Sequence, residues 1–362
     1  MDSPVTTSVF GVVEAPPSPF LTHEELAEKI IGVAVDDRYR VQAQLGQGGM
    51  GGVYKAVHLG LSKTVAIKIL WPELASNVNA LARFQREAKA ASSLNHPGLV
   101  SVSDYGLLKN FQAPYLVMQY VEGKNLADIL QHEYRLTIPR TLNIFIQICD
   151  ALAHAHEHGV IHRDIKPSNI ILQNIKGIET VQIVDFGIAM LMSSFSQEQS
   201  ITASGDVAGS PQYMSPEQCM SEHVDCRTDT YSVACVMYET ITGRPVFTGR
   251  NSLHTMYKQM HEEPDFSVFE QLRLPPSLRR ILVKGLLKKR DQRYQSIMEL
   301  RADLIAVRDQ IFRSLSQRLI RWQSRSFPEK CSASFQTILF VLGWVIVSFY
   351  MWQSTRYFLH VP

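Results

Sequence analysis

Residues 46–53 read GQGGMGGV, in which glycines recur at the spacing G-x-G-x-x-G-x-V. Glycines without Cβ atoms let a backbone close over phosphate oxygens. The same spacing occurs in dinucleotide folds and in ordinary tight turns, so the run alone is weak evidence for phosphate binding. A dinucleotide site needs a strand, then the glycines, then a helix, whereas residues 52–58 continue as a strand pattern. The glycines therefore favour a phosphate loop between two strands.

A lysine follows in a segment that is otherwise apolar. Val65, Ala66 and Ile67 precede Lys68. A lone lysine in a strand is usually an exposed edge residue, but a buried ammonium beside a phosphate loop needs a carboxylate partner, because a desolvated charge alone is costly. Glu87 lies in an amphipathic stretch from about 80 to 94 and can supply that carboxylate.

The most specific pattern comes later in the chain. Residues 162–169 read HRDIKPSN, and DFG follows at 185–187. In isolation the first of these would be a surface charge cluster, but with the earlier motifs it stands in the order of the eukaryotic-type (Hanks-type) protein kinases. The chain resembles that family over about residues 39–310. The sequences of the glycine run and of residues 213–218, YMSPEQ, most closely resemble those of the bacterial membrane-anchored serine/threonine kinases.

The resemblance implies a role for each motif residue. Asp164 would accept the proton of the substrate hydroxyl, and Lys166 would neutralise charge on the transferring phosphoryl group. Asn169 and Asp185 are hard oxygen ligands suited to Mg²⁺. Tyrosine kinases usually lack a lysine at the position of Lys166, so the implied reaction is transfer from ATP to Ser or Thr hydroxyls of proteins. Lys68 and Glu87 complete the implied catalytic set.

Other positions are implied to bind the nucleotide. Adenine should lie between apolar walls, with backbone groups of a hinge at its edge. Met118 matches the gatekeeper, and Gln119 and Val121 match the hinge. The full set implied for ATP is Leu45, Gly46, Gly48, Gly51, Val53, Ala66, Lys68, Met118, Gln119, Val121 and Ile171.

Two further matches are structural. Glu217 would pair with Arg293, and Asp229 would hold the 162–169 loop; the alternative is that these are plain surface charges. The chain departs from the common family pattern at three positions, none of which puts catalysis in serious doubt: Ser210 for Thr, Ser215 for Ala and Arg290 for Pro.

The segment between Gly187 and Gly209 is rich in Ser and Thr. In the family, the arginine that matches Arg163 awaits a phosphate on this activation loop. We therefore expect autophosphorylation, best placed at Thr202 and Ser204, and a homodimer would allow it in trans. The alternative is a flexible linker of ordinary Ser-rich composition.

The elements that must position these residues fall into two lobes. Short segments rich in Val, Ile and Tyr, at 39–44, 52–58 and 63–70, predict an antiparallel strand-rich lobe. A helical period takes over after about residue 125 and is clearest at 140–158. The predicted fold class is α+β, a two-lobed protein kinase fold with one helix in the smaller lobe. Later helices are predicted at about 229–242, 276–288 and 296–322.

The two ends of the chain differ from the middle. Residues 1–36 read as a flexible leader with one short helix, because Thr22 and Glu25 form a capping-box pattern and Gly32 can end it. The remaining predicted divisions are a kinase domain at 37–312, a basic juxtamembrane segment at 313–330, a transmembrane helix at 331–355 and a short tail at 356–362.

The uncharged run at 331–355 is long enough to cross a bilayer. A helix rising about 1.5 Å per residue spans about 30 Å of hydrocarbon with about 20 residues. A buried C-terminal helix is the alternative. Because basic residues cluster before the run, the positive-inside rule predicts a single-pass cell-membrane protein with a cytoplasmic kinase domain. These basic residues are Arg313, Arg318, Arg321, Arg325 and Lys330, and only Arg356 follows the run.

The composition sets the remaining limits. A hydrophobic share of 45% and a charged share of 19% over 362 residues are typical of globular proteins. The net charge of +2 gives no reason to expect nucleic acid as a partner. The five cysteines form no zinc-type pair. Expected partners are thus protein substrates.

The main alternative function is a membrane-anchored pseudokinase scaffold that binds ATP without turnover. The usual mark of a pseudokinase is the loss of Lys68, Asp164 or Asp185, and all three are present. A small-molecule phosphotransferase is a third possibility.

Overall fold

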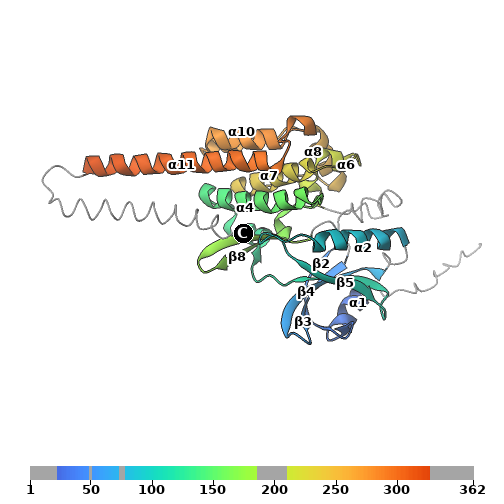
Figure 1. Cartoon of the computed structure of the whole chain (residues 1–362). Helices are drawn as coiled ribbons and strands as arrows, with labels where there is room; N and C mark the ends of the chain where they lie inside the picture. Colours follow the sequence, from blue (N-terminus) through green and yellow to red (C-terminus); the bar gives the residue numbers. More distant parts are fainter. Residues whose placement is uncertain (1–22, 49–50, 73–77, 186–209, 327–362) are drawn as a thin grey trace, which may run out of the picture. The chain divides into compact units, whose positions relative to one another are not determined.

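The computed structural model describes residues 23–48, 51–72, 78–185 and 210–326. The chain divides into two compact units. The small unit comprises residues up to 81 together with 105–117, and the large unit comprises 82–104 and the residues from 118 onward. In Figure 1 strands dominate the small unit and helices dominate the large one.

The small unit is built on a six-stranded sheet with the order β1-β2-β3-β4-β6-β5. The first four strands pair antiparallel with their neighbours. This confirms the strand-rich lobe predicted from sequence. The strands are β1 Ala34–Val35, β2 Tyr39–Gly48, β3 Gly51–His58, β4 Lys63–Leu70, β5 Val102–Leu108 and β6 Ala113–Gln119.

A short helix, α1 (His23–Ile30), joins the core of the small unit. Leu26 and Ile30 lie four residues apart, on one side of the helix, and both are fully buried with Tyr54 and Ile67 of the sheet. Gly32, at φ 84°, follows the helix as expected. Residues 26–35, which the sequence placed in a flexible leader, therefore contribute buried side chains, because the apolar side of α1 packs with the strands.

The large unit is mostly helical and carries a small sheet, β7-β8-β9. Its helices include α2 (Val78–Ser92), which begins just before the unit does. The sheet strands are β7 Lys124–Asn125, β8 Ile170–Ile175 and β9 Ile178–Ile183. The other helices are α3 Leu126–Glu133, α4 Ile138–Glu157, α6 Pro216–Cys219, α7 Arg227–Thr242, α8 Ser252–His261, α9 Ser267–Gln271, α10 Pro276–Gly285 and α11 Ile297–Ser326, with 3-10 turns η2 Pro167–Asn169, η3 Pro211–Tyr213 and η4 Arg290–Gln292.

Helices α4 and α7 form the centre of the large unit, and α10 and α11 pack beside them (Figure 1). The four long helices predicted from hydrophobic periodicity are all confirmed. Gly159, with φ 73°, follows α4 and is the expected stop. Helix α7 is buried on almost every side although it is rich in Thr, Ser and Tyr, which points to hydrogen bonding by its polar side chains inside the core.

Among the helices within the described ranges, none is both long and apolar enough to cross a bilayer. The apolar run at 331–355, predicted as a transmembrane helix, lies outside the described residues.

Candidate active site

The 162–169 loop is held from below by a buried carboxylate of α7. Asp229 accepts hydrogen bonds from the backbone amides of His162 (2.9 Å) and Arg163 (2.8 Å), and His156 Nε2 lies 2.7 Å from the same carboxylate. Burial would raise the pKa of Asp229, but the hydrogen bond with His156 and the backbone hydrogen bond from His162 lower it below its usual value. The carboxylate therefore fixes two successive amides of the loop. His156 was not predicted from the sequence, where its only signal is its place in a His-rich helix end.

His162 connects this loop to the segment before Asp185. Its Nδ1 accepts from the amide of Asp164 (3.2 Å), so its Nε2 carries the proton and donates to the carbonyl of Val184 (2.9 Å). The amide of Val184 in turn donates to the carbonyl of Asn169 (3.0 Å). Both backbone groups of Val184 are thus bonded to the loop, which sets the position of the next residue, Asp185.

Three polar side chains meet within the loop. Lys166 Nζ lies 2.7 Å from Asp164 Oδ2, and Asn169 Nδ2 donates to the backbone carbonyl of Asp164 (2.8 Å) and to Oδ2 (3.2 Å). Because Nδ2 of Asn169 makes these hydrogen bonds, Oδ1 is the side-chain atom that could bind a metal ion. The Asp164 side chain is partly exposed, at 23%, so it is held in place and still accessible.

Two residues of the site have backbone conformations that are uncommon for side chains other than glycine. Arg163 has φ 67° and Asp185 has φ 64°. Such conformations cost about 1–3 kcal/mol each and persist where surrounding contacts enforce them. Here the Asp229 and Val184 hydrogen bonds enforce them. Asp185 is therefore aimed by its surroundings rather than by local preference.

The large unit also carries part of the set predicted for the nucleotide. Met118 and Val121 are buried, and Ile171 lies on β8 opposite Gln182 of β9. The amide of Gln119 donates to the carbonyl of Ser101 (3.0 Å), so this amide is already used within the protein.

The small unit places several other residues of that set on one face of its sheet. The strand register sets Gly46 opposite Val53 and Val53 opposite Lys68. Opposed residues share a face, as do residues two apart, so Ala66 belongs to the same face. The alternate residues of β4, such as Ile67, lie in the core on the other face.

The glycines of the phosphate loop differ in what surrounds them. A Cβ on Gly51 would come 2.1 Å from the carbonyl oxygen of Ile69, so packing against β4 requires a glycine there. A Cβ on Gly46 or Gly48 would meet nothing within 4 Å among the described atoms. Packing therefore gives no reason for those two glycines, and open space above a backbone suits a phosphate. Leu45 beside them is half exposed.

Some predicted residues cannot be examined in this way. The side chain of Glu87 in α2 lies outside the described residues, so its pairing with Lys68 stays a prediction, although Lys68 is buried at 7% exposure. Thr202 and Ser204 also lie outside the described residues.

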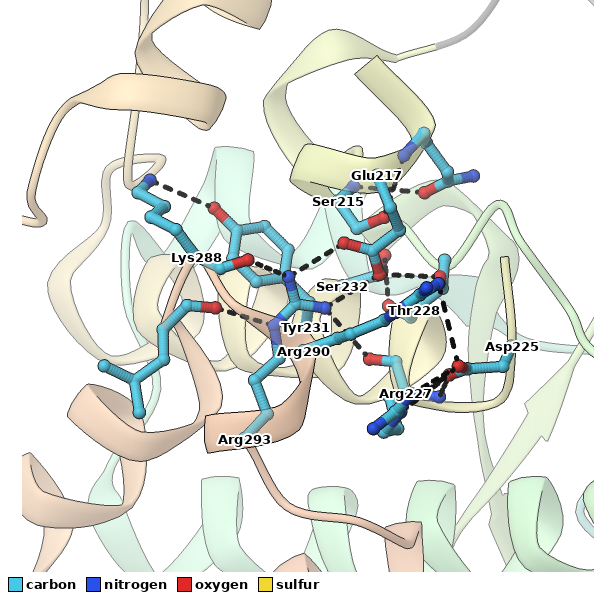
Figure 2. A network of polar contacts seen from close by, with 12 residues as sticks. Ser215, Glu217, Asp225, Arg227, Thr228, Tyr231, Ser232, Lys288, Arg290 and Arg293 are labelled. Carbon is cyan, nitrogen blue, oxygen red and sulfur yellow. Dashed lines mark hydrogen bonds and ion pairs between the residues drawn. The ribbon is translucent and has the colours of Figure 1, made fainter. Parts of the chain in front are cut away.

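The expected partners Glu217 and Arg293 form a buried ion pair (Figure 2). Arg293 Nη1 and Nη2 each lie 2.8 Å from a different carboxylate oxygen, and Thr228 donates to the same carboxylate (2.8 Å). Burial would raise the pKa of Glu217, but Arg293 lowers it to below its usual value. These residues are therefore not plain surface charges.

Ser215 supplies a link that the sequence analysis missed. Its side chain accepts from the amide of Gln218, whose side chain accepts from the amide of Ser215, which makes a capping box. Gln218 Nε2 also donates to the carbonyl of Arg163 (2.7 Å). The Ser-x-x-Gln spacing was the readable signal. The departure from alanine at 215 thus ties α6 to the 162–169 loop.

A cavity of about 340 Å³ lies beside the loop in the large unit. It is polar, and Glu239 at its wall has a pKa raised by burial. Tyr213 donates to Glu239 Oε2 at 2.7 Å. The lining residues are Ala127, Leu130, Gln131, Tyr134, Lys166, Pro167, Ser168, Ser210, Tyr213, Glu239 and Gly243.

No group of three or more His, Cys, Asp or Glu side chains within the described part of the chain could hold a metal ion alone. Asn169 and Asp185 offer oxygen atoms of the type that Mg²⁺ prefers, and Mg²⁺ commonly takes its other ligands from water and phosphate. The donor set therefore fits a metal that arrives with a nucleotide.

Comparison with known proteins agrees with this geometry. Residues 39–304 match the family described as protein kinase domain. The chain is 40% identical over 277 residues to serine/threonine-protein kinase PknB of Mycolicibacterium smegmatis, covering 76% of this chain and 44% of that protein. It is 42% identical over 275 residues to the probable serine/threonine-protein kinase SCO3848 of Streptomyces coelicolor, covering 75% and 40%. The matched region thus spans about two-fifths of these curated relatives.

Solved structures are similar as well. The crystal structure of the Mycobacterium tuberculosis PknI kinase domain matches with a TM-score of 0.60 and 26% identity, covering 76% of this chain and 98% of that one.

Proposed function

Because the chain belongs to the protein kinase domain family, we propose that it is a serine/threonine protein kinase, which transfers the γ-phosphoryl group of ATP to Ser or Thr hydroxyls of proteins. One observation carries the proposal. Asp164, Lys166 and Asn169 lie in one hydrogen-bonded group, and the bonds that hold their loop also set the position of Asp185.

The residues divide the chemistry between them. Asp164 orients the substrate hydroxyl and accepts its proton, while Lys166, 2.7 Å from that carboxylate, places a positive charge where the transferring group becomes negative. Asn169 and Asp185 would hold Mg²⁺, which would neutralise phosphate oxygens when bound. The work left to the protein is positioning and charge stabilisation, which suits a rigidly bonded loop.

Each unit, taken by itself, carries residues that we propose for nucleotide binding. Val53, Ala66 and Lys68 share one face of the small sheet, and no atom of the described residues beyond the chain neighbours lies within 4 Å of a Cβ placed on Gly46 or Gly48, which suits phosphates. Met118, Val121 and Ile171 would supply apolar contacts, and the carbonyl of Gln119 would accept from adenine. Lys68 would hold the phosphates with Glu87 as its partner.

The test is transfer of labelled phosphate from ATP with Mg²⁺ to casein by the purified full chain. Wild type should label casein, and Asp164→Asn should lose the label by orders of magnitude because the hydroxyl loses its base. The exposed Asp309→Asn is the matched control and should keep it. ATP binding without transfer by wild type would instead support a pseudokinase scaffold.

Activation by a loop phosphate is part of the proposal. Arg163 Nε is buried and makes no hydrogen bond to described residues, so an additional acceptor near it would be stabilised. The oxygens of a phosphate on Thr202 or Ser204 could accept this hydrogen bond from Arg163 Nε. A homodimer would let one copy of the chain phosphorylate the other.

The localisation proposal rests on sequence. The uncharged run at 331–355 and the basic residues before it suit a single-pass membrane anchor with the kinase domain in the cytoplasm. Truncation after Phe327 should release active enzyme from membranes. Release of the full chain by carbonate washing would contradict an anchor.

A further inference from the structure

The turn η3 has an unusual set of hydrogen bonds. Four successive carbonyls, from Ser210 to Tyr213, each accept one. The first accepts from the amide of Tyr213 (3.0 Å), and the last from the Ser232 hydroxyl of α7 (2.8 Å). The two between, those of Pro211 and Gln212, accept from one side chain. This turn is therefore held by side chains rather than by a neighbouring strand or helix backbone.

That side chain is Gln259 of α8, which is fully buried. Its Nε2 donates to the carbonyls of Pro211 (3.1 Å) and Gln212 (2.7 Å), and its Oε1 accepts from the hydroxyl of Tyr231 (2.6 Å). A tyrosine hydroxyl facing an amide oxygen and two carbonyls facing an amide nitrogen allow only one orientation of the amide. Every hydrogen-bonding group of this amide is used.

A partly buried ammonium group supports the same arrangement. Lys288 Nζ donates to the backbone carbonyl of Gln259 (2.8 Å) and lies over the ring of Phe247. Figure 2 shows Lys288 reaching the hydroxyl of Tyr231. These contacts fix the end of α8 to the core, and so they fix the backbone position from which the Gln259 side chain reaches the turn.

The turn and the 162–169 loop face a common space. Ser210 and Tyr213 line the 340 Å³ cavity together with Lys166, Pro167 and Ser168. Because Lys166, which lines this cavity, lies 2.7 Å from Asp164, a peptide whose hydroxyl approaches Asp164 would lie beside the turn. A displaced turn would therefore misplace the peptide without touching the nucleotide residues.

We propose that Gln259 is a positioning residue for the protein substrate, holding the Pro211–Tyr213 turn in the conformation that receives the peptide beside Asp164. This inference rests on the proposed kinase activity. It assigns to α8, a helix that contributes no predicted catalytic or ATP-binding residue, control over how tightly substrate binds.

The chain offers a matched control in Gln147 of α4. This residue is also buried, at 6% exposure, and its side-chain amide likewise donates two hydrogen bonds and accepts one. Its Nε2 donates to the carbonyls of Asn143 and Glu179, and its Oε1 accepts from the amide of Val181. Gln147→Leu removes as many buried hydrogen bonds as Gln259→Leu, but away from the turn. Any effect of lost stability alone should appear in both variants.

The experiment measures steady-state kinetics of the full chain with the Ser/Thr peptide that wild type phosphorylates best in a degenerate library. Gln259→Leu should raise KM for the peptide about tenfold, since small misplacements of a substrate are costly, and leave KM for ATP unchanged. Gln147→Leu should change neither. If Gln259→Leu does not fold, Gln259→Glu preserves the side-chain shape and the acceptor for Tyr231 while losing the two donors, and should show the same KM change.

An unchanged peptide KM in a folded Gln259 variant, or an equal rise in Gln147→Leu, would overturn the proposal. If wild type transfers no phosphate, the proposed function fails, and hydrogen exchange decides this inference separately. The amides of residues 212–214 should then exchange faster in Gln259→Leu than in Gln147→Leu. Equal exchange would reject the role of Gln259.

Discussion

The buried pair of Glu217 and Arg293 gives the sharpest test of the large unit. Arg293→Met removes the guanidinium and leaves a carboxylate that is only 4% exposed. Removing one partner of a buried pair costs about 3–5 kcal/mol, because the remaining charge is uncompensated. The loss is made larger by the carbonyls of Leu287 and Lys288, to which Arg293 also donates (2.6 and 2.8 Å).

The matched control is an exposed pair in the same unit. Arg244 and Asp265 lie 3.1 Å apart, with side chains 50% and 59% exposed. Such pairs contribute about 0–1 kcal/mol. Urea unfolding followed by circular dichroism should therefore shift the midpoint by about 1 M or more for Arg293→Met and little for Arg244→Met, given slopes of about 1–3 kcal/mol per molar. Equal shifts would refute the reasoning.

The pH dependence supplies a second check on the same pair. The pKa of Glu217 is below the usual 4.5 in the folded protein, because Arg293 outweighs burial. The pair therefore stabilises the fold above that pH and less as the pH falls through it. In Arg293→Met only the hydrogen bonds from Thr228 and the backbone still oppose the effect of burial on the pKa of Glu217, so Glu217 takes up a proton at higher pH than in wild type. The stability gap between wild type and variant should narrow as the pH falls from 7 toward 4.5.

Three further predictions concern other parts of the molecule. Asp185→Asn and Lys68→Met should each lower phosphate transfer by orders of magnitude with unchanged circular dichroism, because they remove charge and not core volume; near-normal turnover in either would reject its role. Burial lowers the pKa of Lys288 from 10.5 to about 8. Between these pH values the folded protein therefore binds fewer protons than the unfolded chain. Wild type should then gain stability relative to Lys288→Met as the pH rises from 8 to 10.5. Parallel stability curves would contradict that pKa. Thr202→Ala with Ser204→Ala should lose most activity, and mass spectrometry of wild type incubated with ATP should find phosphate there; full activity of the double variant would show that the loop is not a switch.

Sequence was sufficient where a residue type and a local period both carry the signal. The long helices followed from apolar spacing, and the antiparallel strands from Val, Ile and Tyr runs. The Glu217 and Arg293 pair and the role of Asp229 in holding the loop were expected from family resemblance, and the observed hydrogen bonds have that form. Ser215 was readable too, since Ser-x-x-Gln is a capping pattern.

Sequence was insufficient where the contact joins distant segments through ordinary residues. Leu26 and Ile30 form too short a pattern to predict that α1 packs on a sheet rather than remaining in solvent. Gln259 carries no local signal at all, because one amide on a helix is unremarkable until Pro211, Gln212 and Tyr231 are seen around it. Such contacts are specified by the tertiary arrangement alone.

Helix α7 shows why so many of the contacts between distant segments of this fold are polar. A loop presents backbone amides and carbonyls, and when these are buried they need hydrogen-bonding partners that an apolar helix cannot give. Asp229 and Ser232 of α7 bond such backbone groups directly, and three further α7 side chains bond side chains of neighbouring segments. Because each of these segments is bonded to the same rigid helix, their spacing is set by the helical repeat rather than by the loops themselves. The bonds are Thr228 to Glu217, Asp229 to the 162–169 loop, Tyr231 to Gln259, Ser232 to the carbonyl of Tyr213, and Glu239 to the hydroxyl of Tyr213.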